Sequence, residues 1–232
     1  MTHLRAVVGQ VTPRMPGMPS RSAPRLADWT VFFLFAAQGV RNLVGWPGYI
    51  VVACCLLGAI VWSLRGYRND VRLLLLPPEL LAFLLFCASS VLWANYQWVT
   101  VIGVLAQWAA AAAGIWLALS LSWDELLAVL TSALVRMLAI SLAFEVFVTF
   151  AVGQRLAPLW TDYGDEAPGA FYWSENLLLA GGPIQGIPGN RNLLAFAAIL
   201  ALVTVGARIA AGVRGRWPVA SIVIALVTLA LT

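Results

Sequence analysis

The sequence has no lysine, a single histidine and few charged residues of either sign. Only 10% of its 232 residues are charged, whereas 62% are hydrophobic and the mean hydropathy is +0.88. A soluble domain carries about 25% charged residues, so a water-facing fold cannot hide this much apolar surface. The histidine, His3, lies near the N-terminus, which excludes a histidine base or histidine-bound zinc in the apolar part. We therefore predict that most of the chain lies in lipid.

Cysteine is also scarce. Cys54, Cys55 and Cys87 all lie inside apolar runs, and neighbouring residues on a helix point in different directions. We interpret the three as packing residues that form no disulfide. The sequence predicts neither a metal site nor a cofactor.

The basic residues are all arginines and lie mostly in short segments between apolar runs. Four arginines lie in residues 1–26, three in 65–72 and three in 208–216. This distribution is a topology signal, in which arginine-rich segments stay on the cytoplasmic side, and not a nucleic-acid footprint. It predicts a multi-pass protein of the cytoplasmic membrane with a cytoplasmic N-terminus. The arginines expected on the outer side are Arg41, Arg155 and Arg191.

The apolar runs predict an all-α, polytopic transmembrane helical bundle of about seven helices. Residues 1–26, rich in proline and arginine, form a disordered basic tail, and residues 27–232 form the transmembrane domain. The turn 45–48 makes the first two helices a hairpin whose tip lies outside, towards which Arg41 snorkels. Proline at 77 and the capping segment 122–125 mark two later helix starts. The expected helices cover about 29–44, 49–64, 77–94, 98–121, 123–152, 192–209 and 218–232.

Residues 153–190 form the longest polar segment. They carry four carboxylates against one arginine, which favours an extracytoplasmic loop. Aromatic side chains mixed with carboxylates suit carbohydrate contact, and they equally suit a loop lying on a membrane. No feature marks an acid/base pair among these residues. The residues concerned are Asp162, Asp165, Glu166, Glu175, Trp160, Tyr163, Phe171, Tyr172 and Trp173.

Two ionisable residues, Arg136 and Glu145, fall within the predicted helix at 123–152. Nine positions on a helix place them on opposite faces, so they cannot pair with each other. An ionisable residue at membrane depth is a functional candidate, and we treat the two as a possible intramembrane polar site. The alternatives are that Arg136 snorkels to the cytoplasmic side and that Glu145 is protonated or bonded between helices.

An arginine between two asparagines, Asn190-Arg191-Asn192, lies where a Gly/Pro-rich loop gives way to a long apolar run. The N–H groups at a helix start form a positive end that binds anions, and arginine offers a planar fork to phosphate oxygens. We predict a diphosphate-binding site formed by Arg191, Asn190 and Asn192, joined by Arg41 from the other outer hairpin. The alternative is that Arg191 only anchors the helix at the interface.

The stretch from Gly186 to Ala195, with Ser90–Ala94 at the end of the third helix and the short first hairpin, resembles the O-antigen ligase and polymerase family, its actinobacterial members in particular. The resemblance covers the N-terminal half of a family member. It implies a helical membrane glycosyltransferase that moves a glycan from a polyprenyl-diphosphate carrier to an acceptor at the outer face, without metal or nucleotide sugar. Arg191 matches the first of the family's diphosphate-binding arginines.

The family's proposed base, a histidine on a second outer loop, would lie beyond Thr232. The last apolar run is also shorter than the roughly 20 residues that cross a membrane, so we expect a truncated half that is inactive alone. The expected partners are a polyprenyl-diphosphate-linked glycan and membrane lipid, and the acceptor is not specified. Two alternatives are a non-catalytic membrane subunit or fragment, and a transporter or flippase of lipid-linked glycan, whose usual internal repeat is not seen here.

Overall fold

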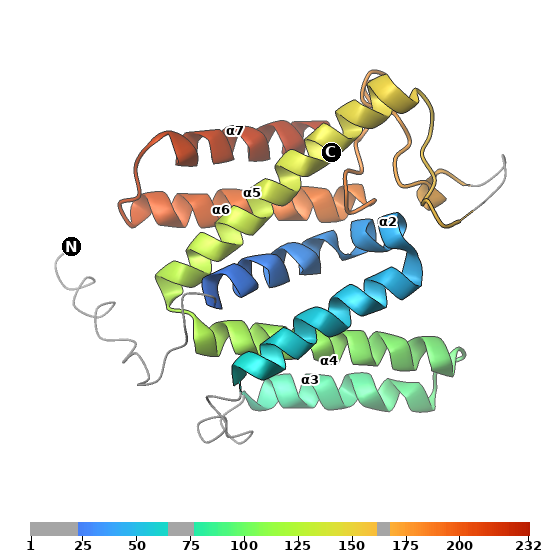
Figure 1. The fold of residues 1–232 in the computed structure, drawn as a ribbon, viewed down its shortest axis with the longest axis vertical. Coiled ribbons are helices and arrows are strands. Elements are labelled where there is room, and N and C mark those ends of the chain that lie inside the picture. The colour runs from blue at the N-terminus through green and yellow to red at the C-terminus, as the bar shows by residue number, and fades with distance from the viewer. Residues whose placement is uncertain (1–22, 65–76, 162–167) are drawn as a thin grey trace. The chain divides into compact units, whose positions relative to one another are not determined.

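The computed structural model describes residues 23–64, 77–161 and 168–232. Within these ranges the chain is helical and has no named strand (Figure 1). Nearly all of the predicted tail, 1–26, lies outside them. The α-helices are α2 (Ala23–Leu64), α3 (Pro78–Ser89), α4 (Gln97–Ser120), α5 (Trp123–Phe147), α6 (Arg191–Ala210) and α7 (Arg216–Leu231), with 3-10 turns η3 (Ser90–Leu92) and η5 (Gly169–Phe171) and a π-helical turn η4 (Val148–Val152).

The chain divides into two compact units. One contains Leu56–Ser122, in which α3 packs on α4 and the indole N–H of Trp108 donates to the carbonyl of Leu84 at 3.3 Å. The other contains Pro24–Cys55 and Trp123–Thr232, and so holds the first arm of α2, the helices α5, α6 and α7, and the long loop. Every residue of the candidate site belongs to this second unit.

The first two predicted helices form one element, α2, that is broken at Gly45. Gly45 has φ 69° and ψ −179°, a conformation that glycine adopts readily. Phe33 and Tyr49 stack with their ring centroids 5.5 Å apart, although a straight helix would separate these positions by about 24 Å. The chain therefore turns back at the break, as the predicted hairpin requires. The first arm begins at Ala23, earlier than the predicted residue 29.

Among the described residues, four helices are long and apolar enough to cross a membrane, which agrees with the predicted membrane class. They are Pro24–Ser63, Gln97–Ser120, Trp123–Val152 and Arg191–Ala210, whereas Pro78–Leu92 and Arg216–Leu231 are shorter apolar helices. The predicted count of seven is not reached, since the described residues form six α-helices. The difference arises because helical geometry resumes directly after Gly45, so that the predicted turn at 45–48 does not separate two helices.

Most other helix boundaries fall close to the predicted ones, but α3 ends at Ser89, before the predicted 94, and a 3-10 turn follows to Leu92. The helix α6 begins and ends one residue outside 192–209, and α5 with its π-helical turn ends at Val152 as predicted. The helix α7 begins at Arg216 and not at 218. Glycine and proline lie next to these boundaries in the sequence. Local signals were therefore sufficient to predict where these helices begin and end.

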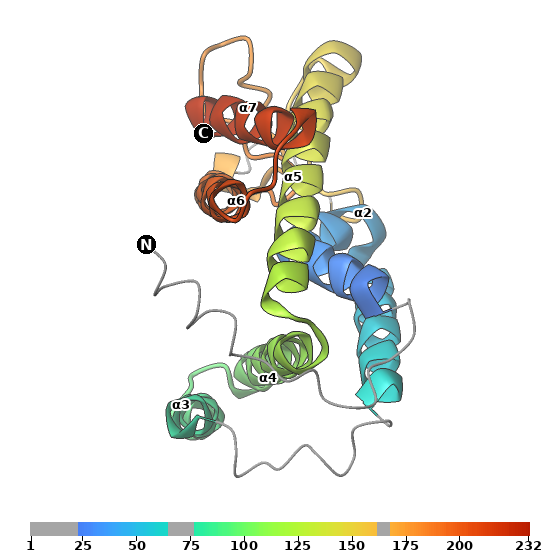
Figure 2. The same ribbon diagram turned by 90° about the vertical axis from the view of Figure 1, so that its left-hand side faces the viewer.

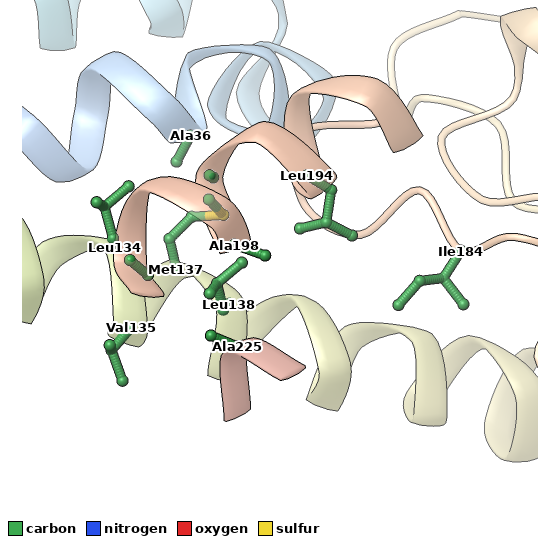
Figure 3. Close-up of a cluster of buried hydrophobic side chains, with 11 residues drawn as sticks. Ala36, Leu134, Val135, Met137, Leu138, Ile184, Leu194, Ala198 and Ala225 are labelled. Atoms are coloured by element: carbon green, nitrogen blue, oxygen red, sulfur yellow. The ribbon is translucent and has the colours of Figure 1, made fainter. Parts of the chain in front are cut away.

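The core of the second unit lies between α5, α6 and α7 (Figures 2 and 3). Ala197, Ala198 and Ala201 of α6 are fully buried in a cluster with Leu134 and Leu138 of α5. Small residues let helix backbones approach closely, a common arrangement between helices in membranes. Ile184 of the long loop joins the same cluster, and its N–H donates to the carbonyl of Leu231 near the end of α7 at 2.8 Å.

Candidate functional site at the break of α2

The long loop is attached to the break of α2 by two hydrogen bonds. In an unbroken helix the carbonyl of Leu43 would accept from residue 47, but Pro47 has no N–H. The indole N–H of Trp160 donates to this carbonyl at 2.8 Å, and the N–H of Leu159 donates to the carbonyl of Asn42 at 3.0 Å. The loop therefore supplies donors to the helix end that the break leaves open.

A pocket of about 440 Å³ lies between the break and the loop, and we call it the break pocket. Its volume is in the range of small-molecule sites, roughly 300–1,000 Å³. Arg41 is its one charged side chain among the described lining residues, and the guanidinium carbon lies 5.0 Å from the ring centroid of Trp46. The lining residues are Arg41, Asn42, Gly45, Trp46, Pro47, Pro158, Trp160 and Thr161.

Asn42 connects the break pocket to the start of α6. Its side chain is only 3% exposed, and its Oδ1 has no hydrogen-bond partner among the described residues. Gly189 packs beside it, since a Cβ at Gly189 would lie 3.4 Å from Asn42 Nδ2. Gly189 also has φ +61°, where a side chain would be strained. The approach of the loop to α2 therefore brings the Asn190–Asn192 stretch next to the break.

The predicted diphosphate ligands are exposed at the first turn of α6. Asn190 is the N-cap, and its Oδ1 accepts from the N–H of Leu193 at 3.1 Å, so its Nδ2 is the atom left for a ligand. Arg191 and Asn192 follow as the first helical residues, and Arg191 makes no ion pair within the described part of the chain. A cation at a positive helix end is unfavourable by itself, and an anion bound there would offset it.

Arg41 and Arg191 lie at the same end of this unit but are not in one cavity. Arg41 lines the break pocket, whereas Arg191 is not among its lining residues. The break of α2, the start of α6 and the end of α7 all lie towards the right-hand side of the view in Figure 1. The link between the two arginines is the contact of Gly189 with Asn42, the residue after Arg41. The structure thus brings the predicted residues near one another without showing them in a single clamp.

Glu145 holds the loop and does not face the break pocket. The carboxyl is 1% exposed and accepts three hydrogen bonds, from Ser174 Oγ at 2.7 Å, Gln185 N at 3.0 Å and Gly186 N at 2.6 Å. One turn earlier, Ser141 Oγ accepts from the next N–H along the loop, that of residue 187, at 3.1 Å. The alternative of a bond between helices is wrong, because the hydrogen-bond partners of Glu145 all lie in the loop. The alternative of a protonated carboxyl stays a prediction.

The described parts of 153–190 are packed into the unit by further contacts. Leu156 and Ser174 form an antiparallel bridge, and the indole N–H of Trp173 donates to the carbonyl of Ile187 at 2.9 Å. The Trp173 ring lies 4.6 Å from that of Phe144 between centroids. These contacts hold the described parts of the loop together and against α5. The predicted loop residues Asp162, Tyr163, Asp165 and Glu166 lie outside the described residues.

Arg136 forms an ion pair with Asp28, which the sequence analysis did not predict as its partner. Its Nη2 lies 2.6 Å from Asp28 Oδ2, and its guanidinium carbon lies 5.0 Å and 4.9 Å from the ring centroids of Trp29 and Phe32. The distance defines an ion pair, although the N–H is not aligned well enough for a hydrogen bond. Arg136 and Glu145 therefore do not pair with each other, as predicted. Their partners are separate, and a functional role for either residue at membrane depth stays a prediction.

No cluster of three or more histidine, cysteine, aspartate or glutamate side chains that could hold a metal ion occurs in the described ranges. Comparison of the chain with protein-family models, with curated proteins and with solved structures gives no match.

Proposed function

We propose that this chain binds a polyprenyl-diphosphate-linked glycan at the outer face of the cytoplasmic membrane, as the resemblance to the O-antigen ligase family implies. The observation that carries the proposal is the close approach of Gly189 to Asn42, which places the chain segment that holds Arg191 near the segment that holds Arg41. Two guanidinium groups and a helix N-terminus at one end of the unit suit the charge of a diphosphate.

The ligand has two chemically different ends, and the unit offers a surface for each. The diphosphate is expected near Arg191, with Asn192 and the first N–H groups of α6 as further donors. The polyprenyl chain is expected along the apolar outside of α6. Phe196, Ile199 and Val203 are exposed there at helical spacing, and they run away from the charged end.

The proposed topology places the break of α2 outside. The apolar part of α2 has 40 residues, twice the roughly 20 that cross a bilayer, and the chain turns back at Gly45. We therefore propose that α2 crosses twice and that the shorter apolar helices also lie in the membrane, with α7 as an incomplete last span. The total would then be about seven membrane helices, with the N-terminus in the cytoplasm.

We propose that this chain binds the carrier-linked glycan, and we do not propose that it transfers the glycan by itself. The general base that the resemblance implies is a histidine on an outer loop, and the single histidine here is His3 in the tail. A glycosyltransferase of O-antigen ligase type would need such a base, or an equivalent, from residues outside this chain. A non-catalytic membrane subunit would show the same binding without turnover.

The experiment compares lipids that differ only in their phosphate group. The purified chain in detergent is titrated with polyprenyl diphosphate, polyprenyl monophosphate and an anionic phospholipid. We expect the diphosphate to bind about tenfold or more tightly than the monophosphate, because it offers more charge-assisted hydrogen bonds. Equal affinity for all three lipids would mean that the basic end recognises only anionic surfaces and would overturn the proposal.

A further inference from the structure

We propose that the break pocket holds the sugar ring next to the diphosphate of the carrier-linked glycan, on a platform formed by Trp46 and Trp160. This inference rests on the proposed function. It adds a site for the carbohydrate part of the ligand, which the two arginines do not provide.

The orientation of Trp160 distinguishes a binding platform from a membrane anchor. An interfacial tryptophan keeps its ring in the apolar layer and uses its N–H in the polar layer. The N–H of Trp160 is already donated to the carbonyl of Leu43 at 2.8 Å, so it is not available to lipid headgroups. The ring is held in place by this bond, yet the side chain is 71% exposed.

One face of the Trp160 ring rests on Gly45. A Cβ at Gly45 would lie 3.1–3.5 Å from three ring atoms of Trp160, which is a tight contact at the nearest of them. Trp160 also lines the break pocket. The C–H bonds on one side of a sugar ring carry slight positive charge and pack well against the negative face of an aromatic ring.

The other lining residues supply polar groups of the kind that bind hydroxyls. Trp46 is 54% exposed and keeps the Arg41 guanidinium 5.0 Å from its ring centroid. Thr161 adds a hydroxyl at the rim, and Asn42 adds a buried carboxamide whose Oδ1 lacks a donor within the described residues.

The size of the break pocket suits one sugar ring. Its volume of about 440 Å³ leaves room for the ring with its substituents, and Arg41 is the one charged side chain among its described lining residues.

The test separates the sugar from the diphosphate. The purified full chain in detergent is titrated with bare polyprenyl diphosphate and with polyprenyl diphosphate carrying one neutral hexose. The variants are Trp46→Leu, Trp160→Leu and Trp160→Phe, and the control is Trp217→Leu, another half-exposed tryptophan at the start of α7. We expect the wild type and the control to bind the sugar-bearing lipid about three- to tenfold more tightly than the bare lipid.

Both leucine variants should lose this preference, measured as the ratio of the affinities for the two lipids. Trp160→Phe keeps an aromatic face and should keep the preference, even if the loss of the Leu43 hydrogen bond lowers stability. If the leucine variants keep the preference, or weaken both lipids equally, the sugar site is wrong and the diphosphate site stands. If the wild type binds neither lipid, the proposed function fails together with this inference.

Discussion

At the scale of single residues, Arg136 shows how a charged side chain is accommodated on an apolar helix. A carboxylate from α2 lies 2.6 Å away, and two aromatic rings lie about 5 Å from the guanidinium. The carboxylate offsets the charge, and the ring faces add cation–π attraction. Since Asp28, Trp29 and Phe32 are all on the first arm of α2, this contact ties that arm to α5.

We predict that Asp28→Asn destabilises the protein by about 1–3 kcal/mol, between the values for exposed and fully buried ion pairs. The side chains of Arg136 and Asp28 are 33% and 19% exposed. The larger cost of breaking a fully buried ion pair is therefore not expected. Thermal unfolding in detergent measures the effect. Asp124→Asn, at an exposed acid in the first turn of α5, is the matched control. Equal stability of Asp28→Asn and the control would show that the pair contributes nothing.

The opposite orientations of Arg136 and Glu145 could be predicted from their spacing on one helix, because helical periodicity is local information. The choice of Asp28 as the partner of Arg136 could not be predicted from the sequence. The chain has ten carboxylates, and nothing in the sequence near Arg136 indicates which of them lies closest in space. The partners of Glu145 are hidden for the same reason, as they lie in a loop 29 to 41 positions further along the chain.

At the scale of elements, the fit between the long loop and α2 depends on a glycine. A Cβ at Gly39 would overlap Ile187 Cγ2 and lie 2.7 Å from the Ile187 carbonyl oxygen. We predict that Gly39→Ala costs about 1–3 kcal/mol through overpacking. Gly206→Ala is the control, since nothing lies within 4 Å of its Cβ position, and it should stabilise α6 by up to about 1 kcal/mol. Thermal unfolding in detergent measures the stability of both variants. A Gly39→Ala variant that is more stable than Gly206→Ala would contradict the packing described here.

The hairpin of α2 could be predicted because Gly45, Pro47 and Gly48 are local signals for a turn. The way in which the break is completed could not be predicted. The donor to the Leu43 carbonyl is Trp160, 117 positions away, and its aromatic character alone fits an anchor as well as a binding surface. The sequence could therefore name Arg41 and Arg191 as site residues but not the break pocket between the loop and α2.

At the scale of the whole molecule, the account requires the long loop to face outward and the arginine-rich segments to face the cytoplasm. We predict that a single cysteine at Asp165, in a background with Cys54, Cys55 and Cys87 replaced by alanine, reacts with a membrane-impermeant thiol reagent in intact cells. A cysteine at Gly212, between α6 and α7, should react only after the membrane is opened. The reverse pattern would overturn the proposed topology.

The binding of polyprenyl diphosphate to Arg191 variants tests the central claim most directly. Lysine keeps the charge but cannot fork onto two phosphate oxygens, so Arg191→Lys should weaken binding roughly ten- to a hundredfold, and Arg191→Ala at least as much. Arg41→Lys should also weaken binding if both arginines act on one ligand. Arg208→Lys, in the last turn of α6, is the control and should bind like wild type. If both Arg191 variants keep wild-type affinity and helix content, Arg191 is only an interfacial anchor and the diphosphate site is wrong.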